Sequence, residues 1–410
     1  MKNNSYVVSQ FPFLLLFLVI LGMFTNDTQG VLNVSAVILL LYTIYTAVKN
    51  KINPWHDILT IVKTRKMLFL FGAWGLFCAL FFTYADFTLA ALKAFFDDWR
   101  YVVIISLFLV VFKSELPKSS KTITYALICT LAFTLFIIPI LKQFKDSDLP
   151  LYLQLRYGFA HYMSLLFPFT FSAFFLFKTK FLRTLMLFLS ILAFLFLLYT
   201  GSRGGILAVV IESFFILLLL SSNYKNLIIN SFRLGILAIS IILVSYYTLP
   251  QVKNKIDQTI YSNNITSGRD KIITTRLPIF MNENKIKLVG IGYGSVAYSQ
   301  YLLDNNAEKK IGRYSEKKKI YVYHNDDPFF LNITYNIGFI GLALFLIAFF
   351  INMKDLFKDI RIEKNILNVG IFVSSIGYFL VYCLFEFIFI DIFILYNILT
   401  AILIKKVLSR

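Results

Sequence analysis

Cysteine and histidine are scarce in this chain, with 3 of each among 410 residues. Cys78, Cys129 and Cys383 all lie inside apolar runs, and no two of them form a CxxC pair. This usage excludes a disulfide-rich secreted fold and gives no sign of a cysteine-based metal cluster. Each histidine is a rare candidate for proton transfer, because imidazole is the side chain that titrates nearest to neutral pH.

Charge is also sparse. Only 15% of the residues are charged and 58% are hydrophobic, whereas about a quarter of the residues of a soluble protein are charged. The composition therefore excludes a soluble protein and predicts an integral membrane protein. The net charge of +18 lies mostly in short connections between apolar runs and in one long loop. That distribution favours anionic lipids or phosphorylated glycolipids as partners and does not favour nucleic acid.

Apolar runs long enough to cross a bilayer recur almost from end to end. A membrane-spanning helix needs roughly 20 apolar residues, and by this criterion the chain has about twelve spans. Strands of a barrel would alternate over about ten residues, so the runs predict an all-α polytopic membrane protein. The expected spans are 10–25, 31–48, 67–85, 100–112, 122–141, 159–177, 181–199, 205–221, 229–248, 329–351, 366–385 and 387–404.

Lysine and arginine gather in every second connection, as in Lys178, Lys180 and Arg183 after the sixth expected span. The positive-inside rule places such connections in the cytoplasm, so we expect both termini there and the long loop on the opposite, outer side. The expected organisation is transmembrane helices one to five over residues 1–158, a second transmembrane domain over 159–404 that includes the outer loop 249–328, and a cytoplasmic tail over 405–410.

The long loop is rich in aromatic residues, too rich for a purely disordered tether, so we expect it to fold. Gly290-Ile-Gly-Tyr-Gly294 marks a sharp turn inside it. The aromatic residues are Tyr261, Phe280, Tyr293, Tyr298, Tyr301, Tyr314 and Tyr321.

The loop ends in His324-Asn-Asp-Asp-Pro328, directly before the tenth expected span. Proline suits the first turn of a helix, so this pattern places a general base at the boundary between water and lipid. One alternative is an ordinary loop histidine, with Asn325, Asp326 or Asp327 capping the helix. Another is a metal site, but no second cluster of ligands accompanies the first.

A second candidate is the turn Thr200-Gly-Ser-Arg-Gly-Gly205, between the seventh and eighth expected spans. Its glycines let the backbone come close to a ligand. The guanidinium of Arg203 can hold phosphate oxygens through paired hydrogen bonds that lysine cannot match. The alternative is a snorkelling anchor in a glycine turn.

Further candidates are less specific. Arg269, in the long loop, is a possible second anion ligand over which the Gly290 turn folds, and Arg276 competes for that role. Taken alone, this pattern favours a solvated loop arginine over an anion ligand. Glu212 lies inside the eighth span, where an ionisable group is costly, so it is either functional or part of a buried pair. Arg156 and His161 lie at the start of the sixth span.

These motifs, in this order, resemble those of the O-antigen ligase family of bacterial inner-membrane enzymes. The resemblance covers roughly the second half to two thirds of the chain, and the first five spans add only hydropathy. It rests on Ala160-His161-Tyr-Met-Ser164, the Thr200 to Gly205 turn, Arg269 ahead of Gly290 to Gly294, and His324-Asn325 ahead of Gly338-Phe-Ile-Gly341.

The resemblance implies a GT-C-like glycosyltransferase of lipopolysaccharide biosynthesis that needs no metal or other cofactor. Such an enzyme moves O-antigen, or a related glycan, from undecaprenyl diphosphate to the outer core of lipid A–core at the periplasmic face of the inner membrane. Carried over to this chain, it assigns Arg203 and Arg269 to the diphosphate and His324 to activation of the acceptor hydroxyl.

Three alternatives remain open at this stage. An O-antigen polymerase uses the same lipid-linked donor, and a protein O-oligosaccharyltransferase passes the glycan to protein. A transporter without chemistry would place ionisable groups and Gly or Pro breaks at mid-membrane in paired repeats. Here most polar features collect at one face, with Glu212 the main exception, so we favour the ligase.

Overall fold

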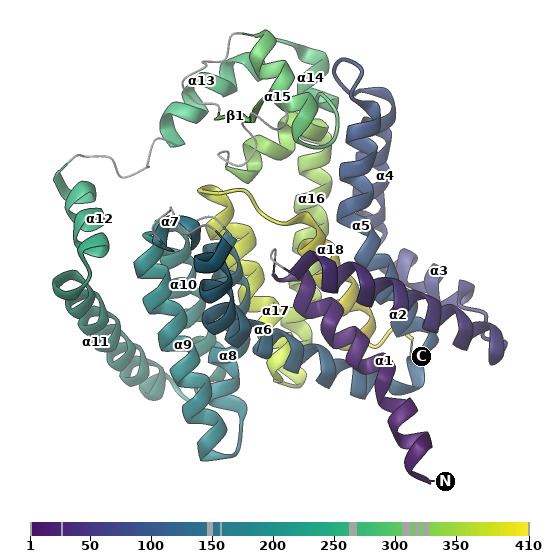
Figure 1. Cartoon of the computed structure of the whole chain (residues 1–410), viewed down its shortest axis with the longest axis horizontal. Coiled ribbons are helices and arrows are strands. Elements are labelled where there is room, and N and C mark those ends of the chain that lie inside the picture. The colour runs from purple at the N-terminus through teal and green to yellow at the C-terminus, as the bar shows by residue number, and fades with distance from the viewer. Residues whose placement is uncertain are drawn as a thin grey trace. The chain divides into compact units, whose positions relative to one another are not determined.

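The computed structural model describes residues 2–25, 28–145, 151–155, 158–261, 269–305, 313–315, 320–322 and 328–408. Within these ranges the regular secondary structure is helical apart from a short hairpin, in which β1 (Arg313–Ser315) pairs antiparallel with β2 (Ile320–Val322). Figure 1 shows the order of the helices along the chain. The prediction of an all-α polytopic membrane protein is confirmed.

Eight helices in the described ranges are long and apolar enough to cross a membrane, or nine if a broken pair forms one span. The broken pair is α3 (Trp55–Thr64) and α4 (Lys66–Phe81), which meet at 93°. Six of the eight are α2 (Gln29–Lys49), α8 (Gly158–Leu176), α9 (Lys180–Thr200), α10 (Arg203–Leu220), α11 (Tyr224–Thr248) and α16 (Phe329–Ile362). The other two are Lys113–Phe144, which contains most of α6 (Leu116–Lys145), and Ile366–Leu384, which begins with α17 (Ile366–Ile376).

The other predicted spans fall on helices that are shorter or more charged. The first lies on α1 (Lys2–Met23), whose apolar part is Gln10–Met23. The last lies on α18 (Ile390–Leu399) and the π-helix η6 (Thr400–Ile404). The span predicted at 100–112 lies in the longer helix α5 (Thr88–Val111), which also carries Lys93, Asp97, Asp98 and Arg100. The higher predicted count therefore stays a prediction.

The described residues divide into two compact units. The first comprises 1–53, 107–265 and 356–382, and the second comprises 54–106, 266–355 and 383–410. The long loop contributes to both, because α12 (Pro250–Tyr261) belongs to the first unit and α13 (Arg269–Met281) to the second.

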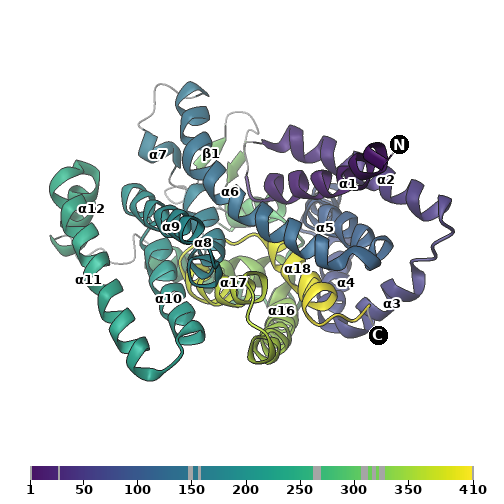
Figure 2. The ribbon, with the colours of Figure 1, turned by 90° about the horizontal axis from the view of Figure 1, so that it is seen from below.

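Helix α8 is the centre of the first unit. Every residue from Phe159 to Ala173 is buried, as expected of a helix that is apolar on all sides. Its neighbours are α6, α9, α10 and α17, which surround it in Figures 1 and 2. The short helix α7 (Leu151–Leu155) and α12 both pack against α9.

The second unit contains a folded part of the long loop. Helices α13, α14 (Asn284–Val289) and α15 (Ser295–Asp304) enclose an aromatic core with the start of α16. In this core the centre of the Tyr335 ring lies 4.9 Å from the ring centre of Phe280 and 4.7 Å from that of Tyr298. Such pairs contribute about 0.5–1.5 kcal/mol each beyond the area that they bury. These helices agree with the prediction that the loop is not a purely disordered tether.

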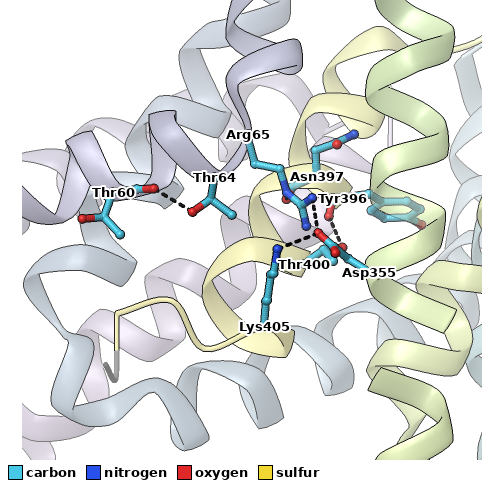
Figure 3. A network of polar contacts seen from close by, with 8 residues as sticks. All are labelled: Thr60, Thr64, Arg65, Asp355, Tyr396, Asn397, Thr400 and Lys405. Atoms are coloured by element: carbon cyan, nitrogen blue, oxygen red, sulfur yellow. Dashed lines mark hydrogen bonds and ion pairs between the residues drawn. The ribbon is translucent and has the colours of Figure 1, made fainter. Parts of the chain in front are cut away.

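A buried ion pair joins distant segments of the second unit (Figure 3). Arg65, at the break between α3 and α4, donates from Nη1 to Asp355 Oδ2 at 2.7 Å and from Nε to the Asn397 carbonyl at 3.0 Å. Lys405 Nζ lies 3.1 Å from the same Asp355 oxygen. The Arg65 side chain is only 1% exposed, so its charge depends on these partners.

Candidate functional site

The turn between α9 and α10 is built from three residues with distinct backbone tasks. Gly201 ends α9 in the left-handed conformation, with φ of 65°, which glycine adopts without steric penalty. Ser202 is the N-cap of α10, and its side chain accepts a hydrogen bond from the Gly205 N–H at 3.3 Å. Arg203 is consequently the first residue of α10.

This position gives Arg203 an anion-binding environment. The first turn of a helix presents backbone N–H groups and the positive end of the helix dipole, and the guanidinium adds a full charge. The Arg203 side chain is half-buried, whereas Gly204 and Gly205 are buried. A Cβ on Gly205 would lie only 2.9 Å from Leu197 Cδ2 on α9, so a larger residue there would require the end of the leucine side chain to move.

An apolar cavity of about 220 Å³ lies further along the same helix. It is bounded by α8, α9, α10 and α11, and its walls include Phe171, Phe194, Val209 and Leu237. Val209 follows Arg203 by six residues, or about 9 Å of helix. The first unit therefore offers a cationic end and an apolar chamber along α10, the combination that an amphiphile with an anionic head requires.

Arg269 begins α13 in the second unit and is already paired there. Its Nε donates to the Phe385 carbonyl at 2.9 Å, and its Nη2 forms an ion pair with Glu386. Its side chain keeps 17% of its surface exposed. A phosphate ligand at Arg269 would thus either displace the Glu386 carboxylate or bind to the guanidinium beside it.

Arg276, on the same helix, has a different environment. The residue is 1% exposed, its Nη1 lies 3.5 Å from the Tyr298 hydroxyl, and its backbone carbonyl accepts a hydrogen bond from Tyr335. It therefore belongs to the aromatic core of the loop. Of the two arginines that compete for the anion-binding role, Arg269 is the accessible one.

His161 lies in the first turn of α8 and is 9% exposed. Its Nδ1 is 2.8 Å from the Tyr378 hydroxyl, and its ring packs edge-on against Tyr382 at 4.8 Å. Tyr378 belongs to the π-helix η4 (Gly377–Val381), which continues α17. The imidazole thus links α8 to η4, and this packing role is sufficient to explain its burial.

Glu212 is completely buried on α10 in the same unit. Neither carboxyl oxygen has a hydrogen-bond partner among the described residues. The carboxyl group faces Gly377, and a Cβ there would collide with Glu212 Oε1. The glycine at the start of the π-helix η4 therefore makes the room that this carboxyl group occupies.

The glycine turn of the loop has a structural task that the sequence did not indicate. Gly290 and Gly338 have φ of 75° and 69°. Gly290 faces the backbone of Asn336 on α16, and Gly338 faces the backbone of Leu288 on α14. The Ile291 N–H donates to the Tyr335 carbonyl at 2.8 Å, beside the kink of α16 at Ile337 and Gly338. The glycines allow two backbones to touch, so the turn packs on α16.

The same turn buries a phenol. Tyr293 donates a hydrogen bond of 2.6 Å to Asp98 Oδ2 on α5. Burial, followed by the nearby Asp98 carboxylate, raises the pKa of Tyr293 well above its ordinary value. The phenol therefore keeps its proton at physiological pH and remains a hydrogen-bond donor.

Arg156 and His324 lie outside the described residues, as do Asn325, Asp326 and Asp327. Pro328 precedes α16, and its carbonyl accepts hydrogen bonds from the N–H groups of Leu331 and Asn332. This agrees with the predicted helix start immediately after the histidine motif. Among the predicted site residues that the structure describes, Arg203, His161 and Glu212 belong to the first unit, and Arg269 and Arg276 to the second.

Glu386 and Tyr378 were not predicted. Glu386 is the acidic residue of an apolar segment between α17 and α18, and such an isolated charge signals a buried or functional partner. Tyr378 gave no comparable signal, because tyrosines are frequent in this chain. Across the described ranges, no group of three or more His, Cys, Asp and Glu side chains has a metal-binding arrangement.

Residues 188–346 match the family model for O-antigen ligase. The match covers less than half of the chain. The matched region starts within α9 and ends within α16, so it includes Arg203, Glu212, Arg269, Arg276 and His324, whereas Arg156 and His161 precede it. No curated protein sequence matches the chain. The domain and the apolar helices together indicate a membrane-bound, glycosyltransferase-like enzyme of the O-antigen ligase or polymerase type.

Proposed function

We propose that the protein is an O-antigen ligase of lipopolysaccharide biosynthesis. It transfers a glycan from undecaprenyl diphosphate to the outer core of lipid A–core, at the periplasmic face of the bacterial inner membrane. The observation that carries this proposal is the position of Arg203, at the N-terminus of α10 and above an apolar cavity, inside the O-antigen ligase domain.

The donor is an amphiphile whose two parts match these two features. A polyprenyl chain leaves water favourably, and the apolar chamber along α10 suits part of it. The diphosphate must stay at the membrane surface, where the first turn of α10 and the Arg203 guanidinium favour a negative charge. A soluble nucleotide-sugar donor would not need the apolar chamber.

Arg203 and Arg269 act on the leaving group. When the bond between the anomeric carbon and the diphosphate breaks, negative charge grows on the leaving oxygen. Guanidinium groups held in place stabilise that charge more than they stabilise the ground state, which accelerates the reaction. In this scheme the ion pair with Glu386 holds Arg269 in position until a donor phosphate arrives.

His324 acts on the acceptor. Neutral imidazole accepts the proton of the acceptor hydroxyl as that oxygen attacks the anomeric carbon from the face opposite to the diphosphate. The reaction then inverts the configuration of the anomeric carbon. A positioned general base of this kind typically contributes about 10²–10⁴ in rate.

The test is a deletion strain complemented with variants. We expect His324→Ala to abolish attachment of the polymer to lipid A–core, while His56→Ala, at an exposed histidine with 92% of its side chain accessible, supports it. A strain without a ligase accumulates full-length lipid-linked polymer, whereas a strain without a polymerase shows short units on the core. Short units in the deletion strain would assign the polymerase reaction, and normal attachment with His324→Ala would remove the role given to that histidine.

A further inference from the structure

A polar cavity of about 250 Å³ lies beside the turn that carries Arg203. Three segments of the first unit form it: α7, the end of α9 with Gly201, and α12. Both α7 and α12 pack against α9, and Figure 1 shows α7 and α12 near one end of this unit. The cavity thus lies next to the proposed diphosphate site but contains none of its residues.

One wall of the cavity is aromatic. Tyr152 from α7 and Tyr199 from α9 meet edge to face, with ring centres 6.3 Å apart and an interplanar angle of 83°. Each ring presents an apolar surface and a hydroxyl group that donates and accepts hydrogen bonds. Such a corner suits a ligand with C–H groups on its faces and hydroxyl groups around its edge.

Another part of the lining is a row of amides. Gln251, Asn254 and Gln258 follow one another at spacings of three and four residues on α12, so they share one face of the helix. Each side-chain amide offers two N–H donors and one carbonyl acceptor. A hydroxyl group needs both a donor and an acceptor beside it, and this row supplies both along its length.

Lys255 forms the side of the cavity nearest to the turn. Its Cγ lies 3.2 Å from the point that a Cβ on Gly201 would occupy, so the aliphatic part of the lysine rests on this glycine. Among the described residues that line the cavity, none is acidic. The cavity therefore has a positive potential on the side that leads towards Arg203, which follows Gly201 by two residues.

These walls select one class of ligand. An apolar tail would offer the amide groups no hydrogen bonds, and a metal cation would find no carboxylate ligand among the described lining residues. The volume is below the roughly 300–1,000 Å³ of a site for a drug-sized molecule. One sugar ring fits this volume, whereas a whole oligosaccharide would extend beyond it.

We propose that this cavity binds the sugar ring that is attached directly to the diphosphate of the lipid-linked donor. The assignment rests on the proposed function, because the diphosphate must lie at Arg203 for its first sugar to enter the cavity. The cavity then selects the donor by its first sugar, independently of the length and composition of the rest of the glycan. The hydroxyl groups of that ring replace water on the amides, and the diphosphate stays outside.

The experiment compares two ligands that differ only in that ring. The purified full-length protein in detergent is titrated with a short polyprenyl diphosphate and with the same compound carrying one hexose. The test variant combines Gln251→Leu with Asn254→Leu, and Gln143→Leu, at an exposed amide on α6, serves as the matched control. Thermal unfolding of each variant verifies that the fold is retained.

We expect the double variant to bind the hexose-bearing compound about tenfold more weakly, since each lost hydrogen bond to a neutral group weakens binding by a factor of about 2–10. Binding of the bare diphosphate should not change, and the control should match the unchanged protein with both ligands. Equal loss of both ligands, or unchanged binding of the hexose-bearing compound, would overturn the assignment and leave a water-filled crevice.

A third variant separates this assignment from the proposed function. Arg203→Ala should weaken both compounds to a similar degree, because both carry the diphosphate. If Arg203→Ala weakened neither compound while the amide variant still discriminated between them, the cavity would remain a sugar site and the diphosphate role of Arg203 would fail. If the amide variant did not discriminate while Arg203→Ala weakened both compounds, the diphosphate role of Arg203 would remain and the assignment of the cavity as a sugar site would fail.

Discussion

At the scale of single residues, Arg203 combines two sources of positive potential. One is its guanidinium, which offers several N–H donors in a fixed plane, and the other is the N-terminus of α10 that begins at this residue. Lysine would keep the charge but not the paired hydrogen bonds to two phosphate oxygens. The geometry of the donors therefore matters as much as their charge.

Arg203→Lys should reduce glycan transfer by about 10–100-fold, the effect of one lost hydrogen bond to a charged group. The comparison is Arg233→Lys, at an exposed arginine on α11 in the same unit. Transfer is measured as polymer attached to lipid A–core in cells with equal amounts of each variant in the membrane. Equal activity of the two variants would mean that Arg203 only anchors the turn.

Asp355 illustrates the other extreme, a charge pair that is inside the protein. Asp355→Ala should lower the stability of the detergent-solubilised protein by about 3–5 kcal/mol, because it leaves the buried Arg65 guanidinium without its carboxylate. The matched variant is Asp97→Ala, which removes the partner of Arg100 in a pair with 43% and 46% exposed side chains. Exposed pairs contribute about 0–1 kcal/mol, so near-equal effects on thermal unfolding would contradict the burial of Arg65.

At the scale of helices and turns, the contact between the Gly290 turn and the kink of α16 depends on the absence of side chains. Gly338 has φ of 69° and ψ of −177°, a region that is essentially restricted to glycine. Its missing Cβ also leaves space for the Leu288 carbonyl. The same α16 follows the segment that carries His324, so this contact fixes the helix next to the proposed base.

Gly338→Ala should therefore destabilise the protein by about 1–3 kcal/mol from backbone strain alone, and by more if α14 must move away. Gly235→Ala is the control, because a Cβ at that position on α11 meets no atom within 4 Å. In a helix that exchange stabilises by roughly 0.5–1 kcal/mol. Thermal unfolding that moves in the same direction for both variants would contradict the proposed backbone contact.

At the scale of the whole molecule, hydropathy predicts the helical class and the position of most spans, because a bilayer requires a long apolar run whatever the sequence around it. It does not predict which helix lies at the centre. Hydropathy even runs the other way, because α8, buried from Phe159 to Ala173, is less apolar than α11, which has one buried residue, Ser245. That difference arises from tertiary packing.

The candidate site, too, was only partly predictable from the sequence. The Arg203 turn was predictable because glycine, an N-cap serine and arginine each have a local reason to be there. The different burial of Arg269 and Arg276 was not, since both are arginines of one helix and only the aromatic core around Arg276 distinguishes them. The glycines of the loop were expected to fold over Arg269, but their contact with α16 depends on a helix that begins well beyond them.

The orientation of the chain is a testable property of the whole molecule. The distribution of lysine and arginine predicts that both termini are cytoplasmic and that α13 to α15 are periplasmic. Alkaline phosphatase fused after Arg410 should be inactive and a fluorescent protein at the same place bright, with the opposite result for fusions after Asp304 at the end of α15. An active phosphatase at the C-terminus would reverse the proposed side of the reaction.

The turn between α9 and α10 has one more consequence. With only Gly201 and Ser202 between the two helices, neither can slide along the membrane normal without dragging its neighbour. The position of the Arg203 guanidinium along the membrane normal then depends on how deeply this helical hairpin is inserted. Lipid chain length determines that depth, because it sets the thickness of the hydrocarbon region. Bilayers of unusual thickness would therefore shift Arg203 along the membrane normal, away from the depth of the phosphates that it is proposed to bind.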